Sequence, residues 1–193
     1  IDDAAQAFGA SKDEKKIGTF SDITTTSFFP AKPLGCYGDG GAIFTDSDEL
    51  NEKLRSLAVH GKGTDKYDNI RIGMNSRLDT LQAAILQEKL NIFPKEIEQR
   101  NLIANLYREK FENLNIHFQY IPKGYKSVYA QFSIILNNEN QRNLIQEALK
   151  KDGIPSVVYY VIPGHLQKGY KYLGYKNGDF PVSEDLSKRI LSL

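Results

Sequence analysis

The stretch ITTTSFFPAKPLGCYG, residues 23–38, constrains the fold most, because it carries a single charged residue, Lys32, in a chain that is 25% charged. Its first half is rich in β-branched and aromatic residues and is followed by Pro30, which is typical of a buried strand that ends in a turn. We therefore expect Lys32 to lie just past the end of a buried strand.

The side chain of Lys32 has two interpretations. Burial of an ammonium group without a partner favours the neutral amine, which is the form that makes a Schiff base with a carbonyl compound. Alternatively, the aliphatic stem packs on Phe28 and Phe29 while the ammonium group reaches water. These residues alone favour the second interpretation, and only a wider pattern in the chain favours the first.

The composition limits the possible partners. The chain has 25 basic and 24 acidic residues and a net charge of +1, so it offers no global field to attract nucleic acid or an anionic membrane. We expect no membrane span and no signal peptide, because no apolar run has the required length. Cys36 is the single cysteine, which excludes an internal disulfide and fits a cytoplasmic location. His60 has no carboxylate or cysteine at ligand spacing, so we predict no metal site and a loop-anchoring role for this histidine.

Periodicity and turn signals indicate alternating strands and helices. Ser47 or Asp48 is placed to cap a helix that Gly61 ends, and residues 11–22 are typical of an exposed excursion. The other expected elements are strands at 42–45, 128–136 and 155–161, and helices at 79–93, from Pro94 to Phe111, at 141–151 and after a Ser183 cap. The pattern predicts an α/β fold with two domains, residues 1–93 and 94–193, the second of which is an α+β domain.

Six blocks in one order resemble the DegT/DnrJ/EryC1/StrS family of nucleotide-sugar aminotransferases, which depend on pyridoxal 5'-phosphate (PLP). The blocks are DAAQA at Asp3–Ala7, SFFPAKPLG at Ser27–Gly35, GDGGA at Gly38–Ala42, HG at His60–Gly61, GMNSRLD at Gly73–Asp79 and QAA at Gln82–Ala84. A looser likeness continues through GIP at 153–155 and PGH at 163–165 to the last residue. Within the family, the sequence around Lys32 resembles most that of the UDP-2-acetamido-2-deoxy-ribo-hexuluronate aminotransferases, which aminate C3 of a UDP-linked 3-keto sugar acid.

The resemblance implies a PLP-transferase fold of type I, like that of aspartate aminotransferase, with the PLP-binding large domain followed by the smaller C-terminal domain. It covers only the later part of the family's enzymes. We therefore expect a chain that is truncated at its N-terminus and slightly at its C-terminus, that lacks half of the cofactor pocket, and that is inactive by itself.

The resemblance also implies roles for residues of the first domain. Lys32 would form the Schiff base with PLP, and the carboxylate of Asp3 would keep the ring nitrogen of PLP protonated. Gln6 would lie beside the ring near its 3-oxygen, and the hydroxyl of Ser27 would donate to the phosphate. For Asp3 the alternative is an ordinary surface carboxylate, and for Ser27 a hydroxyl bonded to its own strand.

Further residues would act across subunits or on the sugar. Asn75 would donate to the phosphate of the neighbouring subunit's cofactor, and Arg77 would meet the anionic part of the substrate, so the resemblance implies a homodimer with shared sites. For Arg77 a surface arginine at a helix start is equally compatible with the sequence. Tyr159 and Tyr160 would contact substrate from opposite faces of a strand, with Tyr159 replacing a histidine of close relatives. His165 would contact the sugar, unless it is a solvated loop histidine.

The resulting prediction is transamination of a keto sugar linked to UDP, with glutamate as amino donor, for the synthesis of surface polysaccharide or glycan precursors. Three alternatives stay open at this point. A dehydratase of the same fold would have histidine in place of the lysine, and Lys32 argues against it. The others are an aminotransferase specific for C4 of a UDP-4-keto-6-deoxyhexose, and a non-catalytic nucleotide-sugar-binding or regulatory protein.

Overall fold

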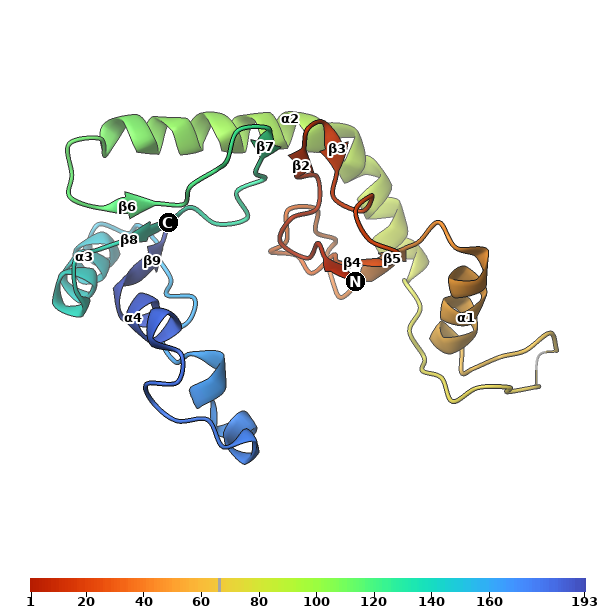
Figure 1. Ribbon diagram of the computed structural model, residues 1–193. Helices are drawn as coiled ribbons and strands as arrows, with labels where there is room; N and C mark the ends of the chain where they lie inside the picture. Colours follow the sequence, from red (N-terminus) through yellow and green to blue (C-terminus); the bar gives the residue numbers. More distant parts are fainter. Residues whose placement is uncertain (66) are drawn as a thin grey trace. The chain divides into compact units, whose positions relative to one another are not determined.

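The computed structural model describes residues 1–65 and 67–193, which form two compact units (Figure 1). The first unit comprises residues 1–102 and 121–130, and the second comprises residues 103–120 and 131–193. The units therefore divide after Leu102 rather than at the expected boundary after Phe93. One reason is that Val128 packs in the core of the first unit, which brings residues 121–130 back to it.

A three-stranded sheet organises the first unit, in the order β1 (Asp2–Asp3), β4 (Thr24–Ser27) and β5 (Gly41–Phe44). β1 and β4 are parallel, with Asp3 opposite Thr25, whereas β4 and β5 are antiparallel, with Ser27 opposite Gly41. Thr24 and Thr26 are buried and the residues that alternate with them are half-buried. The sheet thus has one face toward the core and one more open face.

The predicted exposed excursion contains a small hairpin. β2 (Ser11–Lys12) pairs antiparallel with β3 (Lys15–Lys16) on one side and with β7 (Tyr125–Lys126) on the other. The residues of β3 and β7 are exposed. This second sheet ties residues 121–130 to the first unit.

Helix α1 (Asp48–Ala58) begins as predicted, because the side chain of Ser47 accepts a hydrogen bond from the backbone N–H of Leu50. After α1 the chain crosses itself very closely. A Cβ atom on Gly61 would lie 1.7 Å from the carbonyl oxygen of Arg71, and one on Gly73 would lie 2.1 Å from the backbone nitrogen of Gly61. The crossing therefore requires glycine at both positions, and the backbone N–H of His60 fastens it by donating to Met74 O at 2.8 Å.

Helix α2 (Thr80–Lys110) is one continuous element, whereas the sequence predicted two helices that meet at Pro94. A proline inside a helix costs about 3 kcal/mol, because it lacks the N–H donor and clashes with the preceding turn. Here Phe93 and Ile97, on either side of Pro94, are 4% and 5% exposed. We attribute the continuity of the helix to the burial of these two side chains, which offsets the local cost.

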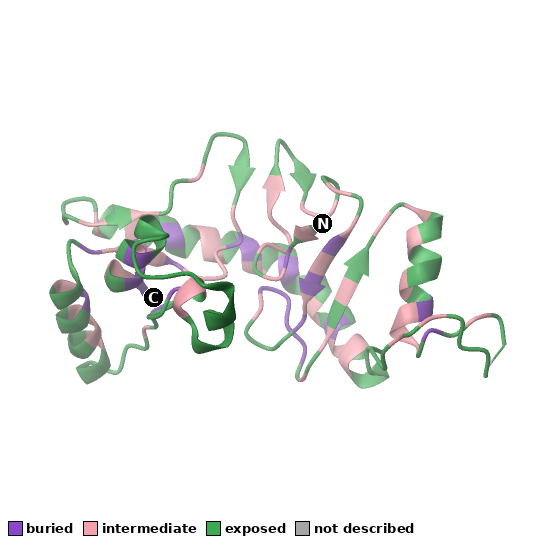
Figure 2. Cartoon of the chain, turned by 60° about the horizontal axis from the view of Figure 1, so that its bottom comes forward, coloured by how far each residue is buried: buried purple, intermediate pink, exposed green. Residues whose placement is uncertain are grey.

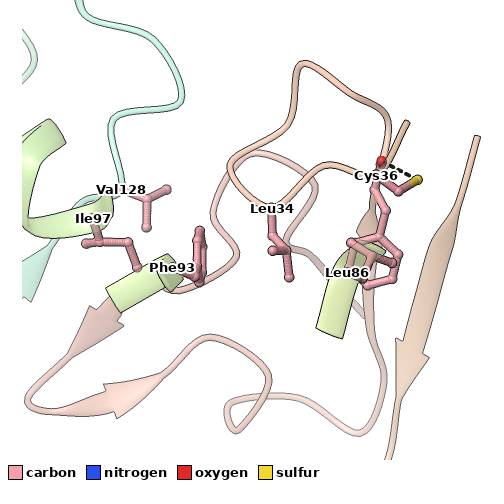
Figure 3. Close-up of a cluster of buried hydrophobic side chains, with 7 residues drawn as sticks. Leu34, Cys36, Leu86, Phe93, Ile97 and Val128 are labelled. Carbon is pink, nitrogen blue, oxygen red and sulfur yellow. Dashed lines mark hydrogen bonds between the residues drawn. The ribbon is translucent and has the colours of Figure 1, made fainter. Parts of the chain in front are cut away.

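The core of the first unit is a row of buried side chains along α2 (Figure 3). Leu86, Phe93 and Ile97 come from α2, and Leu34 and Cys36 come from the loop after β4. Phe28 and Val128 complete the row. In Figure 2, buried positions recur along α2 and in the segments beside it, whereas most of α1 is coloured as exposed. The loop that carries Lys32 is thus part of the core on one side.

The second unit contains a three-stranded antiparallel sheet of β6 (His117–Phe118), β8 (Ser133–Ile135) and β9 (Ile190–Ser192). Its helices are α3 (Glu139–Lys151) and α4 (Pro181–Arg189), with the 3-10 helices η1 (Gly164–Leu166) and η2 (Lys168–Leu173) between them. Helix α3 ends at Lys151 as the sequence predicts, and Asn138 caps its start. Gly153, with a φ of 74°, follows its end. Ile134, Leu136 and Leu191 are buried.

Three predictions for this unit were wrong. The expected strand at 128–136 is reduced to β8, and the expected strand at 155–161 is reduced to a single bridge between Val157 and Ser192. Apolar runs indicate burial, and burial does not require pairing along the whole run. Helix α4 begins at Pro181 without a side-chain cap, so Ser183 lies inside its first turn.

A buried carboxylate joins α4 to the segment before it. Glu184 Oε1 lies 2.9 Å from His165 Nε2, and the same carboxylate accepts from the backbone N–H of Gly178 at 2.8 and 2.9 Å and of Phe180 at 3.3 Å. Burial acts to raise the pKa of Glu184, but the N–H of Gly178, the ring of His165 and the N–H of Phe180 together hold it below the ordinary value of 4.5.

The lowered pKa of Glu184 predicts a pH-dependent contribution to stability. A carboxyl group with a lowered pKa stabilises the folded state above its unfolded pKa, and this stabilisation is lost as the pH falls through the folded value. Glu184→Gln should therefore lower the melting temperature by a few degrees at neutral pH. This difference from wild type should shrink when the pH falls below 4.5, the ordinary pKa of a glutamate carboxyl group. Melting followed by circular dichroism measures this, since the chain has no tryptophan.

Glu147→Gln is the matched control, because Glu147 lies exposed on α3. It should leave the melting temperature unchanged at every pH. A Glu184→Gln difference that stayed constant with pH would contradict the role of the ionised carboxylate.

Candidate functional site

The carboxyl ends of β1 and β4 bring the predicted cofactor residues to one edge of the sheet. Because the two strands are parallel with Asp3 opposite Thr25, Asp3 and Ser27 lie on the same, more open face. Gln6 and Lys32 lie in the loops that leave this edge. In open α/β sheets, ligands bind in the crevice outside the carboxyl ends of parallel strands, so this edge is the candidate site.

The loop that carries Lys32 is closed at its base by backbone hydrogen bonds. The N–H of Cys36 donates to Phe28 O and the N–H of Phe28 donates to Gly40 O, each at 2.8 Å. Within the loop, the N–H of Lys32 donates to Phe29 O at 2.8 Å. The backbone around Lys32 is therefore fixed by the fold and not only by a ligand.

Of the two interpretations of Lys32, the structure matches neither a fully buried nor a fully exposed residue. Lys32 is half-buried, while residues 33–36 after it are buried. The reason is geometric: Leu34 and Cys36 turn into the core, and the reversal of the chain between them and β4 leaves Lys32 farther out. The chain itself fixes the backbone at Lys32 and supplies only part of the shielding of this residue from water.

Two polar side chains at the edge keep binding capacity. Asp3 Oδ1 accepts from the backbone N–H of Ala5 at 2.9 Å, and Asp3 is exposed. Ser27 Oγ accepts from the N–H of Phe29 at 3.2 Å, which uses the oxygen and leaves its O–H proton for an acceptor such as a phosphate. Gln6 is exposed in the turn after β1. The structure thus places a carboxylate, a hydroxyl and an amine-bearing loop at one edge.

Asn75 and Arg77 lie in a different part of the first unit. Their segment follows the end of α1, where the N–H of Ser76 donates to Ala58 O, and Arg77 Nε donates to Asn75 Oδ1 at 2.9 Å. Both residues are exposed and line a cavity of about 900 Å³ together with β5, α1, and Thr25 and Thr26 of β4. Lys32, Asp3 and Ser27 do not line this cavity.

In the second unit, Tyr159 and Tyr160 line one cavity of about 620 Å³, together with the start of α4. Their ring centroids are 5.5 Å apart, and the side chains are 41% and 66% exposed. The prediction that they point to opposite faces of a strand was wrong, because both residues lie in a turn rather than a strand. Within the second unit, the two tyrosines line the same cavity.

His165 is not a solvated loop histidine. Its side chain is 8% exposed, pairs with Glu184, and packs on Phe180 with 4.7 Å between ring centroids. These contacts give His165 a structural role beside the tyrosine cavity, and its contact with a sugar stays a prediction.

Sequence reasoning missed three side chains that shape these regions. Glu184 gave no signal, because a carboxylate in a short helix is usually on the surface. Gln82 belongs to one of the six blocks but received no role, and Lys89 was not singled out. The side chains of Gln82 and Lys89 hydrogen-bond the backbone of the loop that carries Lys32.

Among residues 1–65 and 67–193, no group of three or more histidine, cysteine, aspartate or glutamate side chains could hold a metal ion. In the same described residues, no helix is both long and apolar enough to cross a membrane.

Comparison with known proteins gives consistent matches. The DegT/DnrJ/EryC1/StrS aminotransferase family matches residues 1–193. The UDP-2-acetamido-2-deoxy-3-oxo-D-glucuronate aminotransferase of Pseudomonas aeruginosa is 44% identical over 193 residues, which are 100% of this chain and 52% of that protein. The UDP-N-acetyl-3-dehydro-alpha-D-glucosamine 3-aminotransferase of Acidithiobacillus ferrooxidans is 40% identical, over 100% of this chain and 51% of that protein.

Among solved structures, the crystal structure of a DegT DnrJ EryC1 StrS aminotransferase from Brucella abortus is similar with a TM-score of 0.91 at 50% identity. The match covers 99% of this chain and 50% of that chain, so the chain spans about half the length of the relatives it matches. The mixed α/β architecture and this likeness confirm the predicted type I transferase fold. The chain belongs to the DegT/DnrJ/EryC1/StrS aminotransferase family.

Proposed function

We propose that the full-length protein is a PLP-dependent aminotransferase that moves the amino group of glutamate to C3 of a UDP-linked 3-keto sugar acid, for the synthesis of glycan precursors. In this reaction glutamate leaves as 2-oxoglutarate and the keto sugar becomes an amino sugar, so the two substrates exchange an amino group and an oxygen. The observation that carries the proposal is the convergence of Asp3, Ser27 and the Lys32 loop at the carboxyl edge of β1 and β4.

The donor set at this edge fits PLP. A primary amine binds an aldehyde, a hydroxyl donates to a phosphate, and a carboxylate holds a proton on a pyridine nitrogen. The chain offers one of each in Lys32, Ser27 and Asp3, and Gln6 adds an amide beside them. When bound, PLP supplies the aldehyde that carries the amino group and the ring that delocalises negative charge.

The residues of the chain would then have distinct tasks. Asp3 keeps the ring nitrogen protonated, which preserves the electron-withdrawing character of the ring. Lys32 binds the aldehyde at rest and moves a proton when the amino acid has taken its place. Ser27 and the loop backbone hold the phosphate end in place, so that the reacting atoms stay near Lys32.

The relatives support C3 as the position of amination, since the names of both curated relatives describe a 3-oxo or 3-dehydro sugar linked to UDP. Arg77 suits the anionic part of such a substrate, because a guanidinium group binds a carboxylate or a pyrophosphate through two parallel hydrogen bonds. Tyr159 and Tyr160 would contact the sugar or nucleotide from their cavity in the second unit, with His165 held beside them.

The position of Asn75 and Arg77, exposed and on a cavity that Lys32 does not line, supports a homodimer in which each site takes these two residues from the partner. In this arrangement Asn75 donates to the phosphate of the partner's cofactor. Each catalytic site then contains residues of two copies of the protein.

The first test is chemical. The full-length protein is incubated with PLP, reduced with borohydride, digested and analysed by peptide mass spectrometry. We expect a stable pyridoxyl group on the peptide that contains Lys32, and its loss in Lys32→Arg, because a guanidinium does not bind an aldehyde in this way. The control Lys95→Arg, at an exposed position of α2, should label as wild type does. Equal labelling of wild type and Lys32→Arg would disprove the role of Lys32.

The second test concerns the substrate. With glutamate as donor, kcat/KM for a UDP-3-keto-hexuluronic acid should exceed that for a UDP-4-keto-6-deoxyhexose by about 100-fold. The reason is that a site which binds the carboxylate of the sugar acid rejects an analogue that lacks this group. Product analysis gives the position of amination and detects 2-oxoglutarate. A preference for the 4-keto sugar would favour the C4-specific alternative, and no turnover of either sugar by PLP-loaded protein would favour a non-catalytic binding protein.

The third test concerns the shared sites. Lys32→Ala and Asn75→Asp, each inactive alone, are co-expressed so that mixed dimers form. If the site is composite, about a quarter of all sites combine an intact Lys32 with an intact Asn75, and activity returns to that level. The matched control pairs Lys32→Ala with Asp3→Ala, whose defects fall in the same subunit's share of the site and should not complement. Absence of recovery in the first pair would contradict composite sites.

A further inference from the structure

One face of α2 meets the loop that carries Lys32. The residues on this face are Gln82, Leu86, Lys89, Phe93 and Ile97, at spacings of 4, 3, 4 and 4, which place them on one side of a helix. Leu86, Phe93 and Ile97 belong to the buried core, and the remaining two positions carry polar side chains. Gln82 and Lys89 are both half-buried.

Both polar side chains bind backbone groups of the loop. Gln82 Oε1 accepts from the N–H of Tyr37 at 2.9 Å. Lys89 Nζ donates to Gly35 O at 2.5 Å and lies 5.3 Å from the centroid of the Tyr37 ring, within cation–π range. These contacts fix the chain on both sides of Cys36, whose own side chain is in the core.

The glycines of the loop permit this close approach. A Cβ atom on Gly38 would lie 3.1 Å from Gln82 Nε2, and one on Gly35 would lie 2.6 Å from Pro30 O. The backbone on the two sides of Lys32 therefore packs against itself at Gly35 and against α2 at Gly38.

We propose that Gln82 and Lys89 are positioning residues that hold the loop 28–40, and through it the amine of Lys32, in the place where the cofactor is bound. The consequence for Lys32 rests on the proposed function, whereas the anchoring of the loop does not. Neither residue touches the proposed donor set at the sheet edge. Their effect on Lys32 passes through the backbone between Phe28 and Cys36.

The test uses substitutions that keep the size of each side chain and remove its polar contact, Gln82→Leu and Lys89→Met. Gln82→Glu keeps an acceptor oxygen and Lys89→Arg keeps a donor, so these should restore the wild-type behaviour in part or in full. The matched controls are Gln87→Leu and Lys95→Met, at exposed positions of the same helix. All variants are made in the full-length protein, and circular dichroism verifies that they fold.

Two measurements separate the anchoring from the chemistry. Hydrogen exchange of the cofactor-free protein follows the amide of Tyr37, which should exchange about tenfold faster in Gln82→Leu because opening of the loop becomes easier. The rate of pyridoxyl labelling of Lys32 at limiting PLP should fall about tenfold in Gln82→Leu and in Lys89→Met. The control variants should change neither measurement.

Each outcome decides one part of the proposal. Unchanged exchange at Tyr37 would overturn the anchoring, and faster exchange with unchanged labelling would overturn the positioning of Lys32. Failure of Gln82→Glu and Lys89→Arg to rescue would also overturn it, since the polar contacts would then not be the cause. If wild-type protein does not label at Lys32, the proposed function fails and the positioning role fails with it, while faster exchange at Tyr37 still establishes the anchor.

Discussion

The packing of Leu34 and Cys36 against α2 is the interaction on which the arrangement of the first unit depends. Each fully buried apolar side chain contributes about 1.5–3 kcal/mol, so these contacts are strong enough to draw the loop after β4 down onto the helix. The loop in turn leaves β4 at the edge where β1 also ends. A single apolar contact region therefore joins the sheet edge, the lysine loop and the long helix.

This arrangement explains how a short chain segment can present chemistry at a sheet edge. Surface loops usually make few contacts and are mobile. Here the residues after Lys32 are buried, and the backbone hydrogen bonds of Phe28 and Cys36 close the base of the loop. The functional groups come from three types of position: a strand end for Asp3 and Ser27, a turn for Gln6, and a closed loop for Lys32. Rigid elements thus carry most of the proposed donor set.

Local signals in the sequence predicted much of this. The strand before Pro30, the Ser47 cap of α1 and the end of α3 at Lys151 were all visible, because each depends on residues close together in the chain. Non-local effects were not visible. The continuity of α2 through Pro94 depends on the burial of Phe93 and Ile97, and the helix propensities of single residues do not predict that burial.

The candidate site likewise has a part that the sequence identified and a part that depends on non-local packing. The resemblance of six sequence blocks to the family identified Lys32, Asp3 and Ser27 as candidate site residues. The parallel register of β1 and β4 brings Asp3 and Ser27 to one edge of the sheet. The pairing of His165 with Glu184 joins residues 19 positions apart, and the turn at Tyr159 and Tyr160 replaces an expected strand. Both depend on how the second unit packs, which a pattern of apolar residues does not specify.

Lys32 itself shows what one chain can and cannot supply to a reactive amine. A Schiff-base lysine needs a fixed position and surroundings that exclude water. The core contacts and the hydrogen bonds of the loop fix the backbone at Lys32, whereas Lys32 is only half-buried and Phe29 is 49% exposed. In the proposed function the remaining shielding comes from the cofactor, the sugar and the partner subunit. The exposure of Lys32 and Phe29 fits a site that is complete only when these components are present.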